Sequence, residues 1–372
     1  MYKKKIKEII TNKAQVIYGK NLPEEISARI DNELCTLDEK KSECFWLASL
    51  LSKVCSEDNI SYQLKNFTNP PFIGFLLGLT NINPLSAHYS CKKCHYVEFT
   101  DNNCGVDLQD KECPICNSNM NKDGYDVPMF HNASERDAEI QFVFDAKEIS
   151  KVYEELENIF STYSIIKMYL KIDKKTNRVT THMFKNTPSE EYEFEGIFLL
   201  PKETSIALRN GEEISHAEYR ALYDSSVFIG ISIDNKLDCS DKGQLNRIIT
   251  KTKPSTFNDK IRIAGLFLGG NLWENNAEEL IKNRTLSLDE IITCREDICN
   301  RLLAHGYSKK DAWYVSERIR KGKGLTNQET KVMQEKNVPN WFIMSCNKIL
   351  YAPSRGMCVM FSITYKYVKI LR

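Results

Sequence analysis

The sequence contains no long apolar run. Its longest, residues 72–79, falls far short of the ~20 residues that a membrane-spanning helix needs, so we expect it to be a buried core segment. A secretory signal is also missing, because Lys7 and Glu8 interrupt the apolar residues that follow the basic start. Internal repeats and low-complexity tracts are absent as well. These absences exclude a membrane protein and predict a soluble, cytoplasmic, globular protein.

The chain has almost no net charge. A formal charge of +1 over 372 residues argues against a general nucleic-acid coat. The charge is nevertheless uneven: residues 301–372 hold 14 Lys and Arg against 4 Asp and Glu, a surplus of ten, so the remainder is at −9. Such polarity lets one face meet phosphates while the rest of the molecule does not. The alternative is a solvated basic helix face without a partner.

Cysteine is abundant but shows no disulfide framework. The 13 cysteines are an odd number, and most of them lie in apolar, helical contexts. We therefore expect buried free thiols in a reducing compartment. With 42% hydrophobic residues the chain can bury a substantial core and is long enough for two or three subdomains.

Four of the cysteines form two pairs with matching spacing. Cys91 and Cys94 make one C-x-x-C knuckle, and Cys113 and Cys116 make another. The 18 residues between the knuckles fall within the roughly 15 to 20 expected when both close on one ion. A site of four thiolates has no open position for water, so we predict a structural Zn²⁺ that staples a loop.

The alternatives at this site are four unrelated buried thiols or, less favoured, a disulfide pairing. Cys104 lies inside the loop and His95 follows the first knuckle, so either could substitute as a ligand. Neither completes a second knuckle, and we leave both outside the metal shell.

Hydrophobic periodicity divides the chain into helical and strand-like stretches. Apolar residues recur at helical spacing over about 3–65, alternate with polar ones between 138 and 232, and return to helical spacing after Pro254. The clearest helices predicted in the last part are 276–282, 288–303, 309–321 and 357–371.

Two short segments could carry phosphate chemistry. Alternation places Asp137, Glu139 and Gln141 on one face of a strand, where paired carboxylates can hold Mg²⁺; a solvated acidic strand is the commoner explanation. Residues 320–325 interleave Arg320, Lys321 and Lys323 with glycines, so that a backbone could approach a phosphate. A helix C-cap with basic residues explains that segment equally well.

Short motifs in three stretches of the chain resemble one known family in order and spacing. The first stretch, near the N-terminus, holds Ile9-Ile10-Thr11-Asn12, Tyr18-Gly19 and Leu22-Pro23-Glu24. The second, around the knuckles, holds Asn83-Pro84-Leu85, His88-Tyr89, the first knuckle, Asp110-Lys111, Cys113-Pro114, Lys122-Asp123-Gly124 and Val127-Pro128. The third holds Ala264-Gly265-Leu266, Leu272-Trp273, residues 276–281, Cys294-Arg295, residues 320–326, Val338-Pro339 and Ser345-Cys346. Together they resemble the palm, zinc segment and fingers of the PolC-type DNA polymerase III alpha subunit of Gram-positive bacteria. The resemblance covers most of residues 6–142 and 260–350.

This resemblance implies an α+β fold. We expect a mixed-sheet, palm-like core with an inserted four-cysteine zinc loop, followed by a helical, fingers-like subdomain. The predicted boundaries are 1–90 for the helical N-terminal part of the palm-like region, 91–128 for the zinc insertion, 129–253 for the palm-like sheet and 254–372 for the fingers-like helices.

The positions that react in the family are altered here. The family's phosphate cradle, S-R-G-S-V-G-S-S, aligns with residues 64–71, where two prolines remove amide donors, both glycines are replaced and only Lys65 keeps a charge. The family's glycine-rich Q-H-P-G-G becomes residues 192–196, which include two glutamates that repel anions. A nucleoside triphosphate would therefore lose most of its donors.

The catalytic carboxylates are altered too. The family's P-D-I-D-L-N-F strand aligns with residues 136–142, which keep Asp137 but place Glu139 at the second aspartate. Gly230 aligns with the third carboxylate, and Asp234 is the nearest residue that could replace it. Two-metal nucleotidyl transfer needs carboxylates that hold both ions about 3.5–4 Å apart, so the first two acids are vestigial in this interpretation.

We therefore expect a degenerate relative of this polymerase, without catalysis, that binds DNA or a replisome protein through its basic C-terminal region. The residues predicted to contact DNA or nucleotide are Lys65, Arg320, Lys321 and Lys323. One alternative is an active DNA-directed DNA polymerase fragment, which would need Mg²⁺. Another is a protein-interaction module that competes with the full polymerase for its partners.

Overall fold

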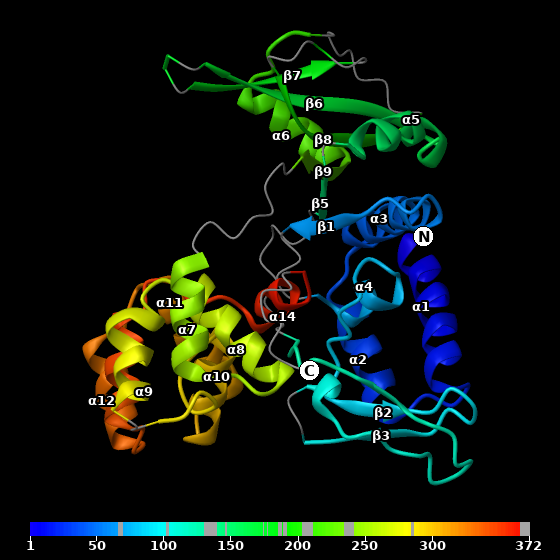
Figure 1. Ribbon diagram of the computed structural model, residues 1–372. Helices are drawn as coiled ribbons and strands as arrows, with labels where there is room; N and C mark the ends of the chain where they lie inside the picture. Colours follow the sequence, from blue (N-terminus) through cyan, green and yellow to red (C-terminus); the bar gives the residue numbers. More distant parts are fainter. Residues whose placement is uncertain are drawn as a thin grey trace. The chain divides into compact units, whose positions relative to one another are not determined.

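The chain folds into two compact units, each built from segments that are separate in sequence (Figure 1). Unit 1 comprises Met1–Phe67, Pro71–Asn81 and Phe130–Asp238, and unit 2 comprises Thr68–Pro70, Ile82–Met129 and Cys239–Arg372. This computed structural model describes all residues except 66–69, 102–103, 130–139, 146, 174, 177, 185–187, 189–191, 203–210, 234–241, 284–285 and 365–372. The zinc segment and the C-terminal helices therefore share one unit, although 109 residues separate Met129 from Cys239.

Unit 1 combines helices with a mixed six-stranded sheet. Its helices are α1 (Tyr2–Tyr18), α2 (Glu24–Cys35), α3 (Glu39–Glu57), α4 (Phe72–Leu76), α5 (Ile149–Ile159) and α6 (His216–Ser225). Its strands are β1 (Tyr62–Lys65), β5 (Ile140–Phe144), β6 (Tyr163–Asp173), β7 (Arg178–Phe184), β8 (Tyr192–Pro201) and β9 (Val227–Ile233). The strand order is β1-β5-β9-β8-β6-β7, with β5 and β9 parallel and the other pairs antiparallel. The predicted α+β class with a mixed sheet is confirmed.

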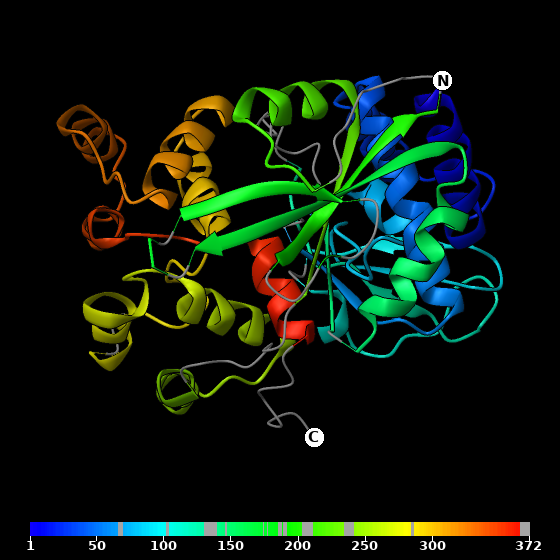
Figure 2. The same cartoon turned by 90° about the horizontal axis from the view of Figure 1, so that it is seen from above.

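The two faces of this sheet are covered by different helices. On one face Phe198 and Phe228 pack with Leu222 of α6 in a buried cluster. On the other face α3 lies against β5 and β9 and also contacts α5. Strand β5 has the sequence pattern that this helix cover requires. Its alternate residues Ile140 and Phe142 are almost fully buried, as expected for a strand whose apolar side faces helices. Figure 2 shows strands β5 to β9 of this sheet in green, with β6 and β7 forming a long hairpin.

The predicted core segment at 72–79 is buried, and its first part is a helix. Phe72, Ile73 and Leu76 of α4 are at most 2% exposed. Both oxygens of the Glu33 carboxylate accept hydrogen bonds from the amides of Phe72 and Ile73, at 2.9 and 2.8 Å. Because these amides open the helix and have no partner within it, the buried glutamate both satisfies them and complements the helix dipole.

Unit 2 combines a small sheet with a set of helices. The sheet has the order β3-β2-β4 and is made of β2 (His88–Ser90), β3 (Val97–Phe99) and β4 (Asn121–Asp123). The 3₁₀ turn η1 (Gly105–Asp107) lies between β3 and β4 in the chain and packs on β4. The helices are α7 (Lys242–Thr252), α8 (Phe257–Leu268), the kinked turn η3 (Trp273–Ala277), α9 (Glu278–Lys282), α10 (Arg295–Ala304), α11 (Lys309–Arg320), α12 (Asn327–Glu335), α13 (Asn340–Lys348) and α14 (Arg355–Thr364). In the part of the chain that the structure describes, no helix has the length and apolar character needed to cross a membrane.

Helix α10 is shorter than the sequence predicts. The expected helix covers 288–303, but α10 begins at Arg295 after Cys294, whose backbone is extended. The Asp297 carboxylate accepts hydrogen bonds from the amides of Thr293 and Cys294, at 2.7 and 3.1 Å, which fixes the helix start. The Arg262 guanidinium lies 3.3 Å from the same carboxylate and donates to three backbone carbonyls between 288 and 291, so the preceding residues form a loop around it.

Candidate functional site

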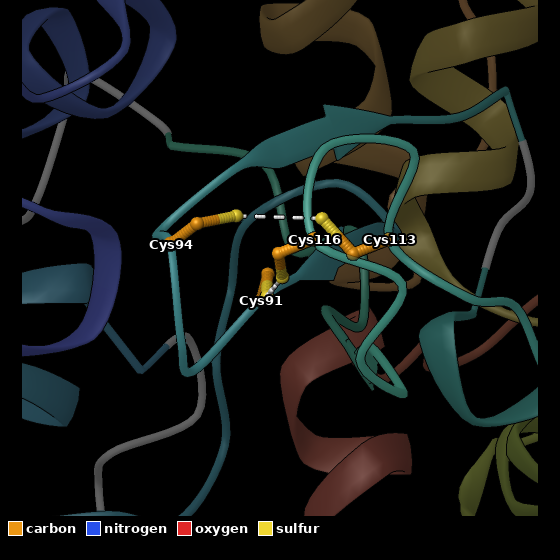
Figure 3. A group of neighbouring side chains, drawn as sticks. All are labelled: Cys91, Cys94, Cys113 and Cys116. Atoms are coloured by element: carbon orange, nitrogen blue, oxygen red, sulfur yellow. Dashed lines mark hydrogen bonds between the residues drawn. The ribbon is translucent and has the colours of Figure 1, made fainter.

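The structure brings the four predicted cysteines of the two knuckles together. Their sulfur atoms all lie within 4.8 Å of one another, and the Cys91–Cys116 and Cys94–Cys113 sulfurs are each 3.4 Å apart (Figure 3). For Zn–S bonds of about 2.3 Å, tetrahedral geometry places sulfurs about 3.8 Å apart, within this range. The donor set of four thiols therefore fits a closed zinc site.

Each knuckle has the same backbone turn. The amide of His95 donates to the Cys91 carbonyl and that of Asn117 to the Cys113 carbonyl, both at 2.9 Å. His95 and Asn117 have positive φ angles of 59° and 56°, so the chain reverses directly behind each second cysteine. Hydrogen bonds from Ser118 to the Cys116 sulfur lower the pKa of that thiol to about 6, which favours the thiolate that a metal binds.

Cys104 and His95 lie outside the four-sulfur cluster. Cys104 is fully buried and packs with Ile82, Val127 and Ile261, and burial raises the pKa of its thiol to about 11. It is a core residue. The prediction that left these two residues out of the metal shell agrees with this geometry.

The loop between the knuckles is tied to the helices of unit 2 by Asp107. Its two carboxylate oxygens accept hydrogen bonds from the amides of Phe257 and Asn258, at 2.7 and 2.8 Å, at the start of α8. Arg355 of α14 donates to the Tyr125 carbonyl at 2.9 Å and to the Asn258 side chain at 3.0 Å. The position of the loop is thus coupled to the N-termini of two helices.

The strands that would carry the reaction centre lie side by side in unit 1. Strand β5 continues the predicted acidic segment and pairs in parallel with β9, with Gln141 opposite Gly230. On its other side Gln141 is opposite Lys65 of β1. Residues opposite each other in a sheet share a face, so the register puts Lys65 and Gly230 on either side of Gln141. Asp137, Glu139 and Asp234 lie outside the described residues.

Gln141 occupies the space above Gly230. A Cβ atom built on Gly230 would lie 2.8 Å from Gln141 Cγ and 3.1 Å from Gln141 Cβ, closer than carbon atoms normally approach. The Gln141 amide nitrogen is 3.4 Å from the Ser232 hydroxyl, two residues further along the same face of β9. A side chain at 230 would therefore require Gln141 to move.

The basic segment at 320–325 forms a helix C-cap. Gly322 has a φ of 70°, its amide donates to the Ile319 carbonyl, and the Lys323 amide donates to the Arg318 carbonyl. This pair of bonds is a Schellman motif, so both amides are occupied and cannot bind a phosphate. A Cβ on Gly322 would lie 2.4 Å from the Leu350 carbonyl oxygen, so this glycine permits close packing of the chain.

The three cations of that segment differ in their surroundings. Arg320 is 25% exposed, and its guanidinium donates to Glu317 at 2.9 and 3.3 Å. Lys321 is 56% exposed and lies 3.5 Å from the same carboxylate, while Lys323 is exposed. Glu317 also binds the buried Arg295, so one carboxylate faces three cations. Burial alone would raise the pKa of Glu317, but Arg320 and Arg295 outweigh it and hold the pKa below its usual value.

Two residues that shape these sites were missed in the sequence, and the contact of a third was not foreseen. Glu317 stands three residues before Arg320, a spacing that favours a helical ion pair and could have been recognised. Asp107 gave no local signal, because it binds amides that are distant in sequence. Alternation placed Gln141 on the acidic strand face, but its position opposite Gly230 depends on the pairing of two distant strands.

Comparison with known proteins identifies the class. Residues 239–340, which hold α7 to α12, match the family model described as the bacterial DNA polymerase III alpha subunit finger domain. Over nearly its whole length the chain is similar to curated proteins named DNA polymerase III PolC-type. The chain is thus similar to one part of PolC-type DNA polymerase III, as its motifs suggested.

The identity and coverage of three relatives show how far this similarity extends. The proteins of Mycoplasmopsis pulmonis and Bacillus subtilis are each 27% identical over 93% of this chain, and that of Caldanaerobacter subterraneus is 27% identical over 96%. The chain spans about a third of the length of these relatives, at 31%, 30% and 32%. The alignments run over 440, 441 and 451 positions, more than the 372 residues of this chain, so the relatives carry insertions within the matched region.

We predict that Cys113→Ser abolishes zinc binding and lowers the unfolding temperature, because three thiolates no longer close the tetrahedron. Zinc content by mass spectrometry and a thermal melt measure the two effects. Chelation of the unmodified protein should lower its unfolding temperature in the same way, and acidification should release zinc because the ligands are thiolates.

Cys104→Ser is the matched control, because it alters a buried cysteine of the same loop that lies outside the sulfur cluster. It should keep its zinc. Loss of zinc from this variant together with retention in Cys113→Ser would contradict the assigned ligand set.

A second prediction concerns Gly230. Gly230→Ala should lower the free energy of unfolding by about 1–3 kcal/mol, because the new methyl group collides with Gln141. In a Gln141→Ala background the same change should cost less, by about 1 kcal/mol, since the colliding Cγ is gone. Urea unfolding of the four proteins of this double-mutant cycle gives the coupling. Additive effects would show that Gln141 does not fill the space above Gly230.

Proposed function

We propose that this chain is a non-catalytic relative of the PolC-type polymerase that binds DNA through exposed lysines of unit 2. In this proposal the four cysteines hold a structural zinc ion that fixes the loop carrying Asp107. The chain's similarity to DNA polymerases supports DNA as the ligand. The surroundings of Gly230 support the loss of catalysis.

The observation that carries the proposal is the contact between Gln141 and Gly230. Two-metal transfer requires carboxylates that bridge both ions, and the third such position aligns with a glycine. The space where a carboxylate would start is occupied by the Gln141 side chain, whose Cγ is 2.8 Å from the built Cβ. Catalysis by the family mechanism would need a new acid on β9 and a displacement of the Gln141 side chain on β5.

The phosphate-binding segment supports the same proposal. Residues 192–196, which align with the family's glycine-rich motif, form the start of β8 and pair with β6 from Lys171 to Met168. Gly196 is also opposite Gly230, and a Cβ on Gly196 would lie 2.6 Å from the Ile229 carbonyl oxygen. Glycine at 196 therefore serves strand packing, and the strand ladder uses backbone groups that a phosphate would need.

DNA binding is assigned to the exposed cations of α11 and the turn that follows it. Lys309, Lys310, Lys321 and Lys323 are all exposed, whereas Arg320 is held by Glu317 and lies 6.0 Å from the Tyr351 ring. Flexible exposed lysines can each neutralise a phosphate, and Lys321 would exchange its 3.5 Å contact with Glu317 for that interaction. We therefore assign Arg320 a structural role and the lysines the phosphate contacts.

Primer extension tests the loss of catalysis. With primed DNA, deoxynucleotides and Mg²⁺ or Mn²⁺, the zinc-loaded protein should give no extension above a protein-free control, because the acidic pair lacks its third partner. Extension that disappears in Asp137→Ala would refute the proposal and establish an active polymerase fragment.

Charge substitution tests DNA binding. The double variant Lys321→Gln, Lys323→Gln should bind duplex DNA about tenfold more weakly and show a salt dependence reduced by roughly two counterions. Anisotropy titrations at several salt concentrations measure both. Lys331→Gln is the control, since this exposed lysine of α12 lies outside the turn and 3.9 Å from Glu335.

Equal losses in both variants would contradict the assigned surface. Binding to another protein that persists at high salt, without DNA binding, would instead support an interaction module that competes with the polymerase.

A further inference from the structure

The end of the unit 1 sheet formed by β8, β6 and β7 carries an aromatic and basic surface. Strand register places the side chains of Lys167, Tyr169 and Lys171 of β6 on one face. Opposite them on the same face are Phe184, His182 and Thr180 of β7, in that order. Tyr192 of β8 is opposite Lys171 from the other side. We name Lys167, Lys171, His182, Phe184 and Tyr192 the aromatic–basic face.

Part of the same sheet face is covered by helix α5, whereas the rings farther out are only partly covered. Tyr169 and Phe194 are 3% and 9% exposed, and Tyr153 of α5 packs edge-on against Phe194 with ring centroids 4.8 Å apart. The rings of His182, Phe184 and Tyr192 are only half-buried. Phe184 and Tyr192 meet edge to face at 5.0 Å, and His182 meets Tyr192 at 5.2 Å. These three rings form a connected aromatic surface that remains partly open to solvent.

The two lysines give this surface a positive charge. The Lys171 ammonium lies 5.1 Å from the centre of the Tyr192 ring, and Lys167 stands opposite Phe184. Glu193 points to the other face of β8 and is exposed. Two acids do lie on the lysines' own face, where Asp173 stands opposite Arg178 and Glu213, which bridges to His182, is 3.7 Å from the same arginine. Cations beside partly exposed rings suit a ligand with a repeated negative charge and flat, apolar groups.

Single-stranded nucleic acid has this chemistry. Its phosphates can meet the lysines while its unpaired bases stack on the rings, whereas in a duplex the base faces are hidden in the stack. An open sheet face with two or three aromatic side chains is a common platform for such strands. From this combination of rings, charge and exposure we propose that the aromatic–basic face binds single-stranded DNA. The choice of DNA instead of RNA as the ligand rests on the proposed function. The assignment of a single-strand binding site to this face does not depend on that function.

The test uses the whole protein and a fluorescein-labelled oligothymidylate of about 12 nucleotides, a length within the usual range of such sites. Tyr192→Leu and Phe184→Leu keep apolar bulk but remove the π face, so each should weaken binding about five- to tenfold. Lys171→Gln should weaken binding and reduce the salt dependence by about 0.7 of a counterion. Thermal melts show whether each variant is folded, and the half-buried Lys171 provides a test even where a ring substitution disturbs the sheet.

Matched controls lie close to the face but outside it. Lys151→Gln removes a 65% exposed cation from α5, and Glu193→Gln alters the opposite side of β8; neither should weaken binding. Photocrosslinking with an oligonucleotide that contains 5-iododeoxyuridine should attach to His182, Phe184 or Tyr192. The attachment should persist in Lys321→Gln, Lys323→Gln, which separates this site from the duplex surface of unit 2.

Unchanged affinity in folded Tyr192→Leu, Phe184→Leu and Lys171→Gln, or crosslinks confined to unit 2, would overturn the proposal and leave the duplex surface of unit 2 standing. Tighter binding of oligouridylate than of oligothymidylate would overturn the assignment to DNA. Loss of duplex binding in the unit 2 variant with intact crosslinking at the rings would support two independent sites.

Discussion

The convergence of four cysteine sulfurs is the constraint on which the organisation of the loop in unit 2 depends. Their sulfurs lie within 4.8 Å of one another, a separation that four ionised thiols would keep only around a cation. The loop between the two knuckles contains Asp107, which accepts the first amides of α8. Through Arg355, which joins Tyr125 to Asn258, the same segment also reaches α14. An ion at the knuckles would therefore influence helices more than a hundred residues away, without contacting them.

The sheet of unit 1 brings together the strands that align with the family's reaction strands, and a side chain fills the space above Gly230. Parallel pairing of β5 with β9 brings Gln141 beside Gly230, and β1 brings Lys65 alongside. The glycine is surrounded: Gln141 lies above it, and Gly196 is paired to it on the neighbouring strand. Packing around Gly230 therefore opposes any larger side chain at this position unless Gln141 moves.

The sequence predicted the features that depend on short spacing and missed those that depend on strand register. The knuckles were predictable because each needs only two cysteines three positions apart. Strands followed from apolar alternation in residues such as Ile140 and Phe142, and the mixed sheet followed from the resemblance to the polymerase family. The contact between Gln141 and Gly230 joins residues far apart in the chain and becomes visible only when β5 and β9 are paired. The start of α10 was missed for a similar reason, since the loop before it is organised around the side chain of Arg262.

In the basic C-terminal region, residues 301–372, the net charge overstates the number of cations that are available to a ligand at the surface. Its Glu317 already pairs with Arg320 of the same region and with the buried Arg295, which lies just before the region and also pairs with Glu296. Arg295 also lies 4.5 Å from the Trp313 ring, so its charge is held within the fold. Arginines suit such sites because the guanidinium is planar and makes several directed hydrogen bonds, whereas lysines remain hydrated at the surface. The surplus of ten therefore contains a structural part carried by arginines and a surface part carried by lysines, and only the second can exchange counterions for phosphates.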